Sequence, residues 1–302
     1  MSNRLRIAII GPGRVGRALA MGWKNVGHTI VATTSSSKEQ VRDALSWQLP
    51  NTPMVAADEL PDADLVAVTT PDDAVGPVVD SLAKLGRWRP GQIVLHASGS
   101  HGLDVLEPAA RAGALTIAIH PAMTFSGYSL DLQRLVDCPV AVTANAVAMP
   151  IAQALIYELQ AQPVPIEDGQ RQLYHAALTH GANHIFTVLT QARSALELAG
   201  VEDSGAFLRP LAQASLENAL AEDPSALTGP VVRADTGTLR RHLTQLQSLQ
   251  QSPAARPPYF GSREVADTYL ALAQATAFLA HEAGRLSQRQ LDAVLLALRD
   301  KP

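Results

Sequence analysis

The segment Leu5–Gly16 reads LRIAIIGPGRVG, and it decides the fold of the first half of this chain. Its apolar start predicts a buried strand over Leu5–Ile10. The residues that follow match the pattern G-x-G-x-x-G and lead into a helix expected to begin near Arg14; they are Gly11, Pro12, Gly13, Arg14, Val15 and Gly16. A strand, a glycine turn and a helix in this order predict a turn that binds the pyrophosphate of a dinucleotide. A glycine turn that only connects two elements is the alternative.

The residues after the second predicted strand bear on which dinucleotide is bound. Enzymes that use NAD place Asp or Glu about 20 residues beyond the glycines, against the ribose 2′-hydroxyl. The strand predicted at Thr29–Thr33 leads instead into side chains that would hold a 2′-phosphate, namely Thr34, Ser35, Ser36 and Lys38. With Arg14 as a further contact, they favour NADP(H) over NAD(H), and a simple polar turn is the alternative.

Short apolar runs alternate with helical patterns in the first half of the chain, which predicts an α/β Rossmann domain with a mostly parallel sheet. The predicted strands are Leu5–Ile10, Thr29–Thr33, Leu65–Thr69, Gln92–Leu95, Leu115–Ile119, Pro139–Val142 and Val164–Ile166. A helix is expected from Ala146 to Gln160. We place the domain boundary at Asp168, which is expected to cap the next helix, so that residues 1–168 bind the cofactor.

Residues 169–302 show no strand signals and predict an all-helical domain for substrate binding and dimerisation. The expected helices are Gln170–Ala199, Ser204–Ala221, Asp235–Leu249, Glu264–Ala283 and Ser287–Leu298. Turn-forming segments separate them, among them Asp223–Ser225 and Ser252–Tyr259. These helices are rich in Leu and Ala, and such a domain often completes its core against a second copy. We therefore expect a homodimer.

The composition argues against several classes of function. The chain has 302 residues with 47% hydrophobic and 17% charged residues and a net charge of -4, which predicts no basic surface for nucleic acid or anionic membranes. The single cysteine, Cys138, fits a reducing compartment. No apolar stretch reaches the roughly 20 residues of a membrane span, and no signal-peptide pattern is present. These features predict a cytoplasmic protein.

Further motifs follow the later strands and continue into the helical half. They are His96-Ala97-Ser98-Gly99, His120-Pro121, Tyr174-His175-Ala176-Ala177 with Asn183, and Leu227–Asp235, which reads LTGPVVRAD. With the glycine turn, these motifs make the chain similar to Rossmann-like oxidoreductases that carry the C-terminal domain of unknown function 2520. Pyrroline-5-carboxylate reductases and 6-phosphogluconate dehydrogenase-like enzymes are related to these proteins. The resemblance spans nearly the whole chain and implies an NADP-dependent oxidoreductase. The family usually has Gly at the position of Ala234 and often Ser at that of Ala182.

His120 is the main candidate for proton transfer, because histidine titrates near neutral pH. It follows the strand Leu115–Ile119 and is expected on a constrained turn that resembles the His-Pro turn of prephenate dehydrogenases. A histidine that only holds the loop is the alternative, and for His96 that structural role is favoured over the catalytic one. The nicotinamide side is expected to be lined by Thr70, Pro71 and Ser98. The neighbouring acids Asp72 and Asp73 are expected to cap a helix.

The long helix predicted at Gln170–Ala199 carries His180, Asn183 and His184 on roughly one face. Asn183 would orient the substrate or the nicotinamide carboxamide. His180 and His184 have the i,i+4 spacing of metal ligands, but no third ligand is evident, so no metal is expected. Tyr174 is expected to pack at the domain seam.

The turn around Arg233 allows two interpretations. Thr228 or Arg233 would reach the substrate pocket, where Arg233 suits an anionic substrate; alternatively, Asp235 caps the next helix and pairs with Arg233. No lysine lies between Lys84 and Lys301, so the helix-borne lysine of hydroxyacid dehydrogenases has no counterpart here.

Taken together, the residues predict an NADP-dependent oxidoreductase that transfers a hydride to or from a small carbonyl or imine compound. The substrate is expected between the nicotinamide, His120 and Asn183. One alternative is a non-catalytic NADP-binding sensor or scaffold, which the missing lysine favours. The other is an oxidative dehydrogenase of the prephenate type, which the His-Pro turn suggests.

Overall fold

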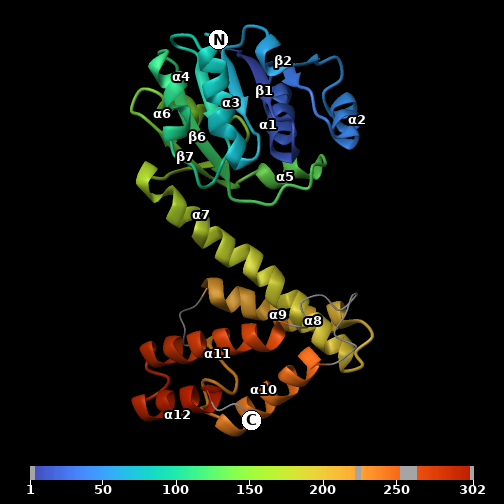
Figure 1. Cartoon of the computed structure of the whole chain (residues 1–302), viewed down its shortest axis with the longest axis vertical. Coiled ribbons are helices and arrows are strands. Elements are labelled where there is room, and N and C mark those ends of the chain that lie inside the picture. The colour runs from blue at the N-terminus through green and yellow to red at the C-terminus, as the bar shows by residue number, and fades with distance from the viewer. Residues whose placement is uncertain (1–3, 222–225, 252–263, 300–302) are drawn as a thin grey trace. The chain divides into compact units, whose positions relative to one another are not determined.

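A computed structural model describes residues 4–221, 226–251 and 264–299 of the chain. It divides into two compact units, residues 1–178 and 179–302, which are drawn in Figure 1. The predicted turn segments Asp223–Ser225 and Ser252–Tyr259, like Lys301, lie outside the described residues. Within the described ranges, no helix has both the length and the apolar character needed to cross a membrane.

The first unit is built on an eight-stranded sheet with the order β3-β2-β1-β4-β5-β6-β7-β8. The strands are β1 (Arg6–Ile10), β2 (Thr29–Thr34), β3 (Met54–Val55), β4 (Leu65–Val68), β5 (Ile93–His96), β6 (Leu115–Pro121), β7 (Pro139–Ala144) and β8 (Gln162–Pro165). All neighbours pair in parallel except β6 and β7, which are antiparallel. The predicted α/β Rossmann domain with a mostly parallel sheet is confirmed, and β3 is an addition that the sequence did not predict.

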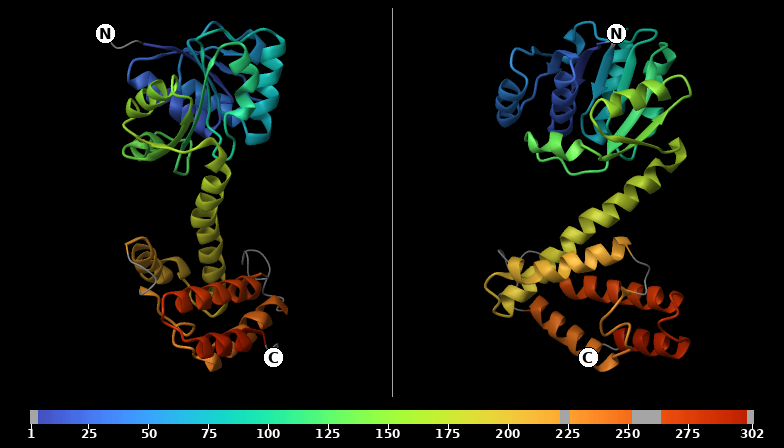
Figure 2. Two further views of the ribbon diagram at one scale, coloured as in Figure 1. Left: turned by 90° about the vertical axis from the view of Figure 1, so that its left-hand side faces the viewer. Right: turned by 180° about the vertical axis from the view of Figure 1, so that it is seen from behind.

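Helices cover both faces of this sheet, as Figure 2 shows. They are α1 (Arg14–Asn25), α2 (Glu39–Gln48), α3 (Asp72–Lys84), α4 (Glu107–Arg111), α5 (Leu130–Leu135) and α6 (Met149–Tyr157). A further helix, α7 (Arg171–Thr179), follows β8 and does not lie on a face of the sheet. Successive side chains of a strand point to opposite faces. Ile7 and Ile9 of β1 therefore join the core under α1 and α6, whereas Ala8 and Ile10 join the core under α3 and α4. The central strands are buried on both sides, which fixes their carboxyl ends as one rigid edge.

The second unit is all-helical in its described residues, as predicted. It contains a π-helical turn (His180–His184), α8 (Ile185–Leu198), α9 (Ser204–Ala221), α10 (Thr236–Gln251), α11 (Val265–Glu282) and α12 (Gln288–Arg299). The π turn interrupts the single helix that was expected over Gln170–Ala199. Asp235 caps α10, because its Oδ1 accepts a hydrogen bond of 3.0 Å from the Thr238 amide. Ala234, where the resembling family usually has Gly, has a left-handed backbone with φ 53°.

The cap predictions for two other acids are wrong. Asp168 Oδ1 accepts a hydrogen bond of 2.7 Å from the Leu103 amide, and Glu167 occupies the cap position of its own turn. Asp72 lies inside the first turn of α3 after Pro71, and its Oδ2 accepts a hydrogen bond of 2.9 Å from the Ser100 hydroxyl. In both cases the carboxylate accepts a hydrogen bond from a residue distant in sequence, whereas local spacing had predicted a bond to the end of its own helix.

Candidate active site

The glycine turn lies at the topological switch point of the sheet. The chain leaves β1 for β2 on one side, and the later strands from β4 onward are added on the other side of β1. In open α/β sheets, ligands bind outside the carboxyl ends of the strands at such a point. The turn Gly11–Gly16 follows β1 and the segment Thr69–Pro71 follows β4, so both segments border this position.

Each glycine of the turn has a separate physical reason. Gly11 has φ 84°, and a Cβ atom there would lie 2.7 Å from the Thr70 amide nitrogen. At Gly16 a Cβ atom would overlap the Thr69 hydroxyl and lie 2.7 Å from the Gly11 carbonyl oxygen. Gly13 is exposed, and the nearest atom to an added Cβ is 4.0 Å away. Gly11 and Gly16 are thus required by the packing of the protein itself, whereas Gly13 leaves open the side from which a pyrophosphate would approach the helix N-terminus.

The loop after β2 presents the groups that the sequence assigned to a 2′-phosphate. The Thr34 hydroxyl is buried and accepts a hydrogen bond of 2.9 Å from the Gly11 amide, so it holds the glycine turn against β2. Ser35 and Lys38 are exposed, and the Lys38 amide donates to the Ser36 hydroxyl at 3.2 Å. Hydroxyl and ammonium groups on one short loop fit a phosphate.

Arg42 is a further candidate for the 2′-phosphate site, which the sequence did not single out. It lies in α2, and its Nη1 donates a hydrogen bond of 2.7 Å to the Ser36 carbonyl oxygen. The guanidinium therefore joins Lys38 at the end of the same loop. The signal in the sequence was the position of an arginine one turn into the helix that begins after Lys38.

A second loop is fixed against the start of α1. The fully buried carboxylate of Asp131 accepts hydrogen bonds from the Ser126 amide at 2.9 Å, the Ser126 hydroxyl at 2.7 Å and the Gly127 amide at 2.7 Å. Burial raises the pKa of Asp131, but these hydrogen bonds outweigh it and lower the pKa overall. The Gly127 carbonyl oxygen in turn accepts hydrogen bonds from Gln48 Nε2 at 2.8 Å and Arg17 Nη2 at 3.5 Å. The loop after β6 is thereby held beside the glycine turn.

His96 is fully buried at the end of β5, and backbone groups occupy both of its ring nitrogens. Nδ1 accepts a hydrogen bond of 3.1 Å from the Ser98 amide, so Nε2 carries the hydrogen that it donates to the Gly102 carbonyl oxygen at 2.8 Å. Burial lowers the pKa of His96 to about 4. A neutral, inaccessible imidazole holds the loop 96–102 in place, which favours the structural role over the catalytic one.

His120 lies in a strand and not on a turn. β6 continues through Pro121, and His120 pairs with Ala141 of β7, so the expected constrained turn after Ile119 is wrong. The strand continues because the antiparallel partner β7 extends alongside it. His120 Nδ1 lies 2.9 Å from the Tyr174 hydroxyl, and the His175 ring meets the His120 ring edge-on with centroids 5.7 Å apart.

The surroundings of His120 keep its imidazole neutral. Burial lowers the pKa of His120 to about 4, and the positive charges of His175 and Arg171 add to this effect, against the opposing carboxylate of Asp72. At neutral pH the ring is therefore a hydrogen-bond partner for Tyr174 and not a source of a positive charge.

Tyr174 was expected to pack at the domain seam, but its hydroxyl contacts His120. Burial raises the pKa of Tyr174, with the nearby Arg171 charge opposing, so the phenol keeps its proton at neutral pH. The i,i+3,i+4 spacing of Arg171, Tyr174 and His175 places all three on one face of α7. That spacing was the available signal for this cluster.

Gly99 makes room for the two imidazoles. A Cβ atom at this position would lie 2.5 Å from His175 Cδ2 and 2.9 Å from His120 Nε2. The motif His96–Gly99 therefore contributes to the site through a loop shape, with His96 holding the loop and Gly99 admitting the rings. Ser98, which was expected on the nicotinamide side, accepts a hydrogen bond from the His101 amide at 3.2 Å through its hydroxyl.

Other candidates belong to the second unit. His180 Nδ1 and His184 Nδ1 are 2.8 Å apart within the π turn, and the Asn183 carbonyl oxygen accepts a hydrogen bond of 3.1 Å from the Thr187 hydroxyl. The pairing of Asn183 with His120 and the reach of Arg233 toward a substrate stay predictions. In the part of the chain that the structure describes, no group of three or more His, Cys, Asp or Glu residues is arranged to hold a metal ion.

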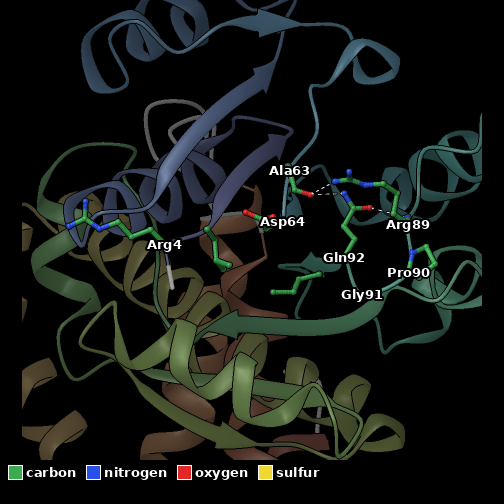
Figure 3. Close-up of a pocket in the computed structure, with 9 residues that line it drawn as sticks. Arg4, Ala63, Asp64, Arg89, Pro90, Gly91 and Gln92 are labelled. Carbon is green, nitrogen blue, oxygen red and sulfur yellow. Dashed lines mark hydrogen bonds between the residues drawn. The ribbon is translucent and has the colours of Figure 1, made fainter. Parts of the chain in front are cut away.

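The opposite edge of the sheet also carries a hollow, of about 430 Å³, at the amino ends of β1, β4 and β5 (Figure 3). Its polar groups bind one another. Arg89 contacts Asp62 at 3.1 Å and donates to the Ala63 carbonyl oxygen at 2.9 Å, where Gln92 Nε2 also donates at 2.9 Å. Asp64 accepts a hydrogen bond of 2.7 Å from the Arg6 amide. These contacts hold the starts of the strands in place.

Two family models match the sequence. A Rossmann-like domain matches residues 1–121, and the domain of unknown function 2520 matches residues 138–276. No curated protein sequence matches this chain.

Several solved structures share the fold. One is a Bacteroides fragilis protein provisionally assigned as an NADP oxidoreductase, which is 21% identical with a TM-score of 0.72 over 91% of this chain and 98% of that one. An imine reductase from Myxococcus stipitatus in complex with NADP⁺ is 16% identical, with a TM-score of 0.56 over 98% of this chain and 100% of that one. Prephenate dehydrogenase from A. aeolicus, in complex with hydroxyphenyl propionate and NAD⁺, is 11% identical, with a TM-score of 0.51 over 98% and 92%. These likenesses establish the fold.

Proposed function

Because this chain belongs to the proteins that combine a Rossmann-like domain with the domain of unknown function 2520, we propose that it is an NADP-dependent oxidoreductase acting on a small carbonyl or imine compound. The observation that carries the proposal is the turn Gly11–Gly16 at the switch point of the sheet. Its one exposed glycine, Gly13, opens the amide groups of the α1 N-terminus to an anionic diphosphate.

The preference for NADP(H) over NAD(H) rests on the loop after β2. Lys38 and Arg42 supply two positive charges beside the hydroxyls of Ser35 and Ser36, and the loop Thr34–Lys38 contains no carboxylate. A 2′-phosphate placed there would gain charge-assisted hydrogen bonds, whereas the two hydroxyls of an NAD ribose would leave both cations unpaired. The imine reductase of this fold is bound to NADP⁺ and the prephenate dehydrogenase to NAD⁺, so the loop residues, and not the fold, support the choice.

The residues of the protein would supply a proton to the substrate. The bound cofactor supplies the hydride. Reduction of a carbonyl or imine also needs a proton at the substrate oxygen or nitrogen, and Tyr174 holds one on a half-buried hydroxyl. His120 Nδ1 fixes that hydroxyl in place, while its own low pKa keeps the ring neutral. Tyr174 is therefore proposed as the proton donor in place of His120, and His120 orients the Tyr174 hydroxyl.

The decisive experiment is titration of the purified full-length protein with NADPH and NADH, followed by fluorescence. We expect saturable binding of NADPH that is at least about tenfold tighter than binding of NADH. NADPH oxidation would then be measured across keto acids, aldehydes and cyclic imines. Absence of saturable binding by both nucleotides would contradict the proposal. Binding without turnover across the panel would favour a sensor or scaffold, and reduction of NADP⁺ by cyclic hydroxylated acids would favour the oxidative direction.

We also propose that a second copy of the chain covers apolar side chains of α8 and α9. Several of them are strongly exposed in the single chain, including Phe186 at 75%, Phe207 at 66%, Leu211 at 68% and Leu220 at 81%. Exposed apolar surface of this kind marks interaction sites. Light scattering should show a dimer for the wild type. Leu211→Glu should dissociate this dimer, whereas the control Leu85→Glu, on the first unit, should leave it intact. A monomeric wild-type protein would contradict this proposal.

A further inference from the structure

Arg171, the first residue of α7, is fully buried without an acidic partner. Its Nη1 donates a hydrogen bond of 3.1 Å to the Thr143 hydroxyl, and its Nη2 donates one of 2.6 Å to the Ser98 carbonyl oxygen. Its Nε has no hydrogen-bond partner, and among the described residues no carboxylate lies within ion-pair distance of the guanidinium. Burying a charge beside neutral partners costs several kcal/mol in general. A role for the buried Arg171 charge would explain why this cost is accepted.

The two hydrogen bonds of Arg171 reach both neighbours of the strand that carries His120. Ser98 follows β5, and Thr143 belongs to β7. The sheet order places β6 between these two strands, so the guanidinium bridges across the strand of His120. One helical turn further along α7 come Tyr174 and His175, the two side chains that meet the imidazole.

We propose that Arg171 is a positioning residue, which locks the first turn of α7 across β6 so that Tyr174 meets His120, and which provides a fixed positive charge beside that pair. The proposal rests on the proposed function only in treating the pair as the group that transfers a proton. Its geometric part concerns the first unit alone, because all the residues involved lie within residues 1–178.

The charge has a consequence for proton transfer. Donation of the Tyr174 proton leaves negative charge on the phenolic oxygen, and a preorganised cation in a dry site stabilises such charge. The groups that face the pair are His175 and Arg171 from α7, Asp72 from α3 and, toward Tyr174, the Cys138 thiol before β7. Of these, only Arg171 carries a permanent positive charge. Its effect lowers the pKa of both Tyr174 and His120, which keeps the imidazole neutral while it makes the phenol a better acid.

The test uses the full-length protein without substrate. Arg171→Gln removes the charge but can still form hydrogen bonds, Arg171→Lys keeps the charge but cannot bridge both partners, and the control Thr143→Val removes one partner and keeps the guanidinium. The pH titration of His120 would be followed by ¹⁵N NMR, with assignment from His120→Gln. Ionisation of Tyr174 would be followed by ultraviolet absorbance, with Tyr174→Phe as the difference standard.

In Arg171→Gln we expect the midpoint of His120 to rise by about one pH unit from about 4, and that of Tyr174 to rise as well. Thr143→Val should keep both midpoints near the wild-type values. In Arg171→Lys the His120 midpoint should stay low, but the Nδ1 signal should lose the shift that marks its hydrogen bond to Tyr174.

A folded Arg171→Gln protein with unchanged titrations would overturn the role of the charge. An Arg171→Lys protein with an unchanged His120 Nδ1 signal would overturn the positioning role. If Arg171→Gln does not fold, Arg171→Lys still tests this role. Circular dichroism is the folding control. None of these measurements uses cofactor or substrate. If the wild type failed to bind NADPH, the proposed function would be wrong, and the titrations would still test the role of Arg171.

Discussion

The two edges of the sheet use polar groups in opposite ways. At the amino edge, Arg89 and Gln92 both donate hydrogen bonds to the Ala63 carbonyl oxygen (Figure 3). Arg89 also pairs with Asp62, so these groups bind within the protein. At the carboxyl edge, the glycine turn exposes the α1 N-terminus, and no carboxylate of the described residues lies within ion-pair distance of Arg171. The same sheet therefore carries one edge that is complete in itself and one that is not.

This difference identifies function better than the presence of a hollow does. A pocket lined by charged residues is found at the amino edge, yet its Arg89 and Asp64 side chains are bound to neighbouring groups of the protein. The exposed helix N-terminus at the switch point and the buried Arg171 charge beside β6 are features that the packing of the protein alone does not explain. Substitutions at Gly13, His96, the loop after β2 and Arg89 test this contrast between the edges.

The largest effect is expected at Gly13. Gly13→Val places a side chain where a pyrophosphate would approach, while the nearest protein atom to the new Cβ is 4.0 Å away. Affinity for NADPH should fall at least about 100-fold, or roughly 2.7 kcal/mol, with little change in melting temperature. Gly16→Val is the matched contrast, because its Cβ overlaps the Thr69 hydroxyl and should lower the melting temperature itself. Tight NADPH binding by Gly13→Val would remove the turn from the cofactor site.

His96 should make stability depend on pH. Burial lowers its folded pKa to about 4, below the ordinary value of 6.5, so the unfolded chain binds more protons between these values. Stability is therefore fully retained above pH 6.5, falls as the pH drops toward 4, and levels off below. Urea unfolding should show that the wild type loses up to about 3 kcal/mol more than His96→Gln between pH 7 and pH 4.

His120 contributes to both proteins in that comparison and cancels in the difference. Equal pH dependence in the two proteins would mean that His96 is protonated as readily when folded as when unfolded. The burial and the tautomer described for it would then be incorrect.

A smaller effect is expected from the cations of the loop after β2. In the double variant Lys38→Gln and Arg42→Gln, affinity for NADPH should fall about tenfold, since a charge-assisted contact contributes roughly 1.4 kcal/mol. Affinity for NADH should stay the same, because NADH carries no 2′-phosphate. Parallel loss of both affinities would indicate that the loop acts through the fold and not through a phosphate.

The smallest effect is expected at the amino edge. Arg89→Ala removes an exposed ion pair with Asp62 and one hydrogen bond to a carbonyl oxygen, so stability should change by less than about 1 kcal/mol. NADPH affinity should not change. A marked loss of cofactor affinity in this variant would break the contrast between the edges.

The sequence was sufficient for the elements whose signals are local. The glycine turn, the apolar strands and the change to helices after Ile166 were all placed within a few residues, because periodicity and glycine spacing depend on near neighbours. The two-residue strand β3 has no periodicity to detect. The extension of β6 through Pro121 was also missed, because proline normally argues against a strand and the pairing with β7 decides otherwise.

The candidate site was less accessible to such reasoning. Tyr174 contacts His120 across 54 positions of sequence, and helical spacing identifies a shared face without naming its partner. Arg171 was not singled out, because arginine at the start of a helix is usually exposed. Arg42 was not predicted because it lies in α2, beyond the loop, and only the folded chain brings it to the Ser36 carbonyl oxygen. Distant pairing decides these roles, and a single sequence does not reveal it.

If His120 lies beside the substrate, as proposed, its location within β6 constrains how substrates can differ. Pairing with Ala141 of β7 holds the backbone of His120, and the Tyr174 hydroxyl and the His175 ring hold its imidazole in place. Adaptation to a new compound would have to come from the helix or loop opposite, with the strand acting as a fixed reference. An enzyme arranged in this way should tolerate variation at the remote end of a substrate far better than at its reacting atom.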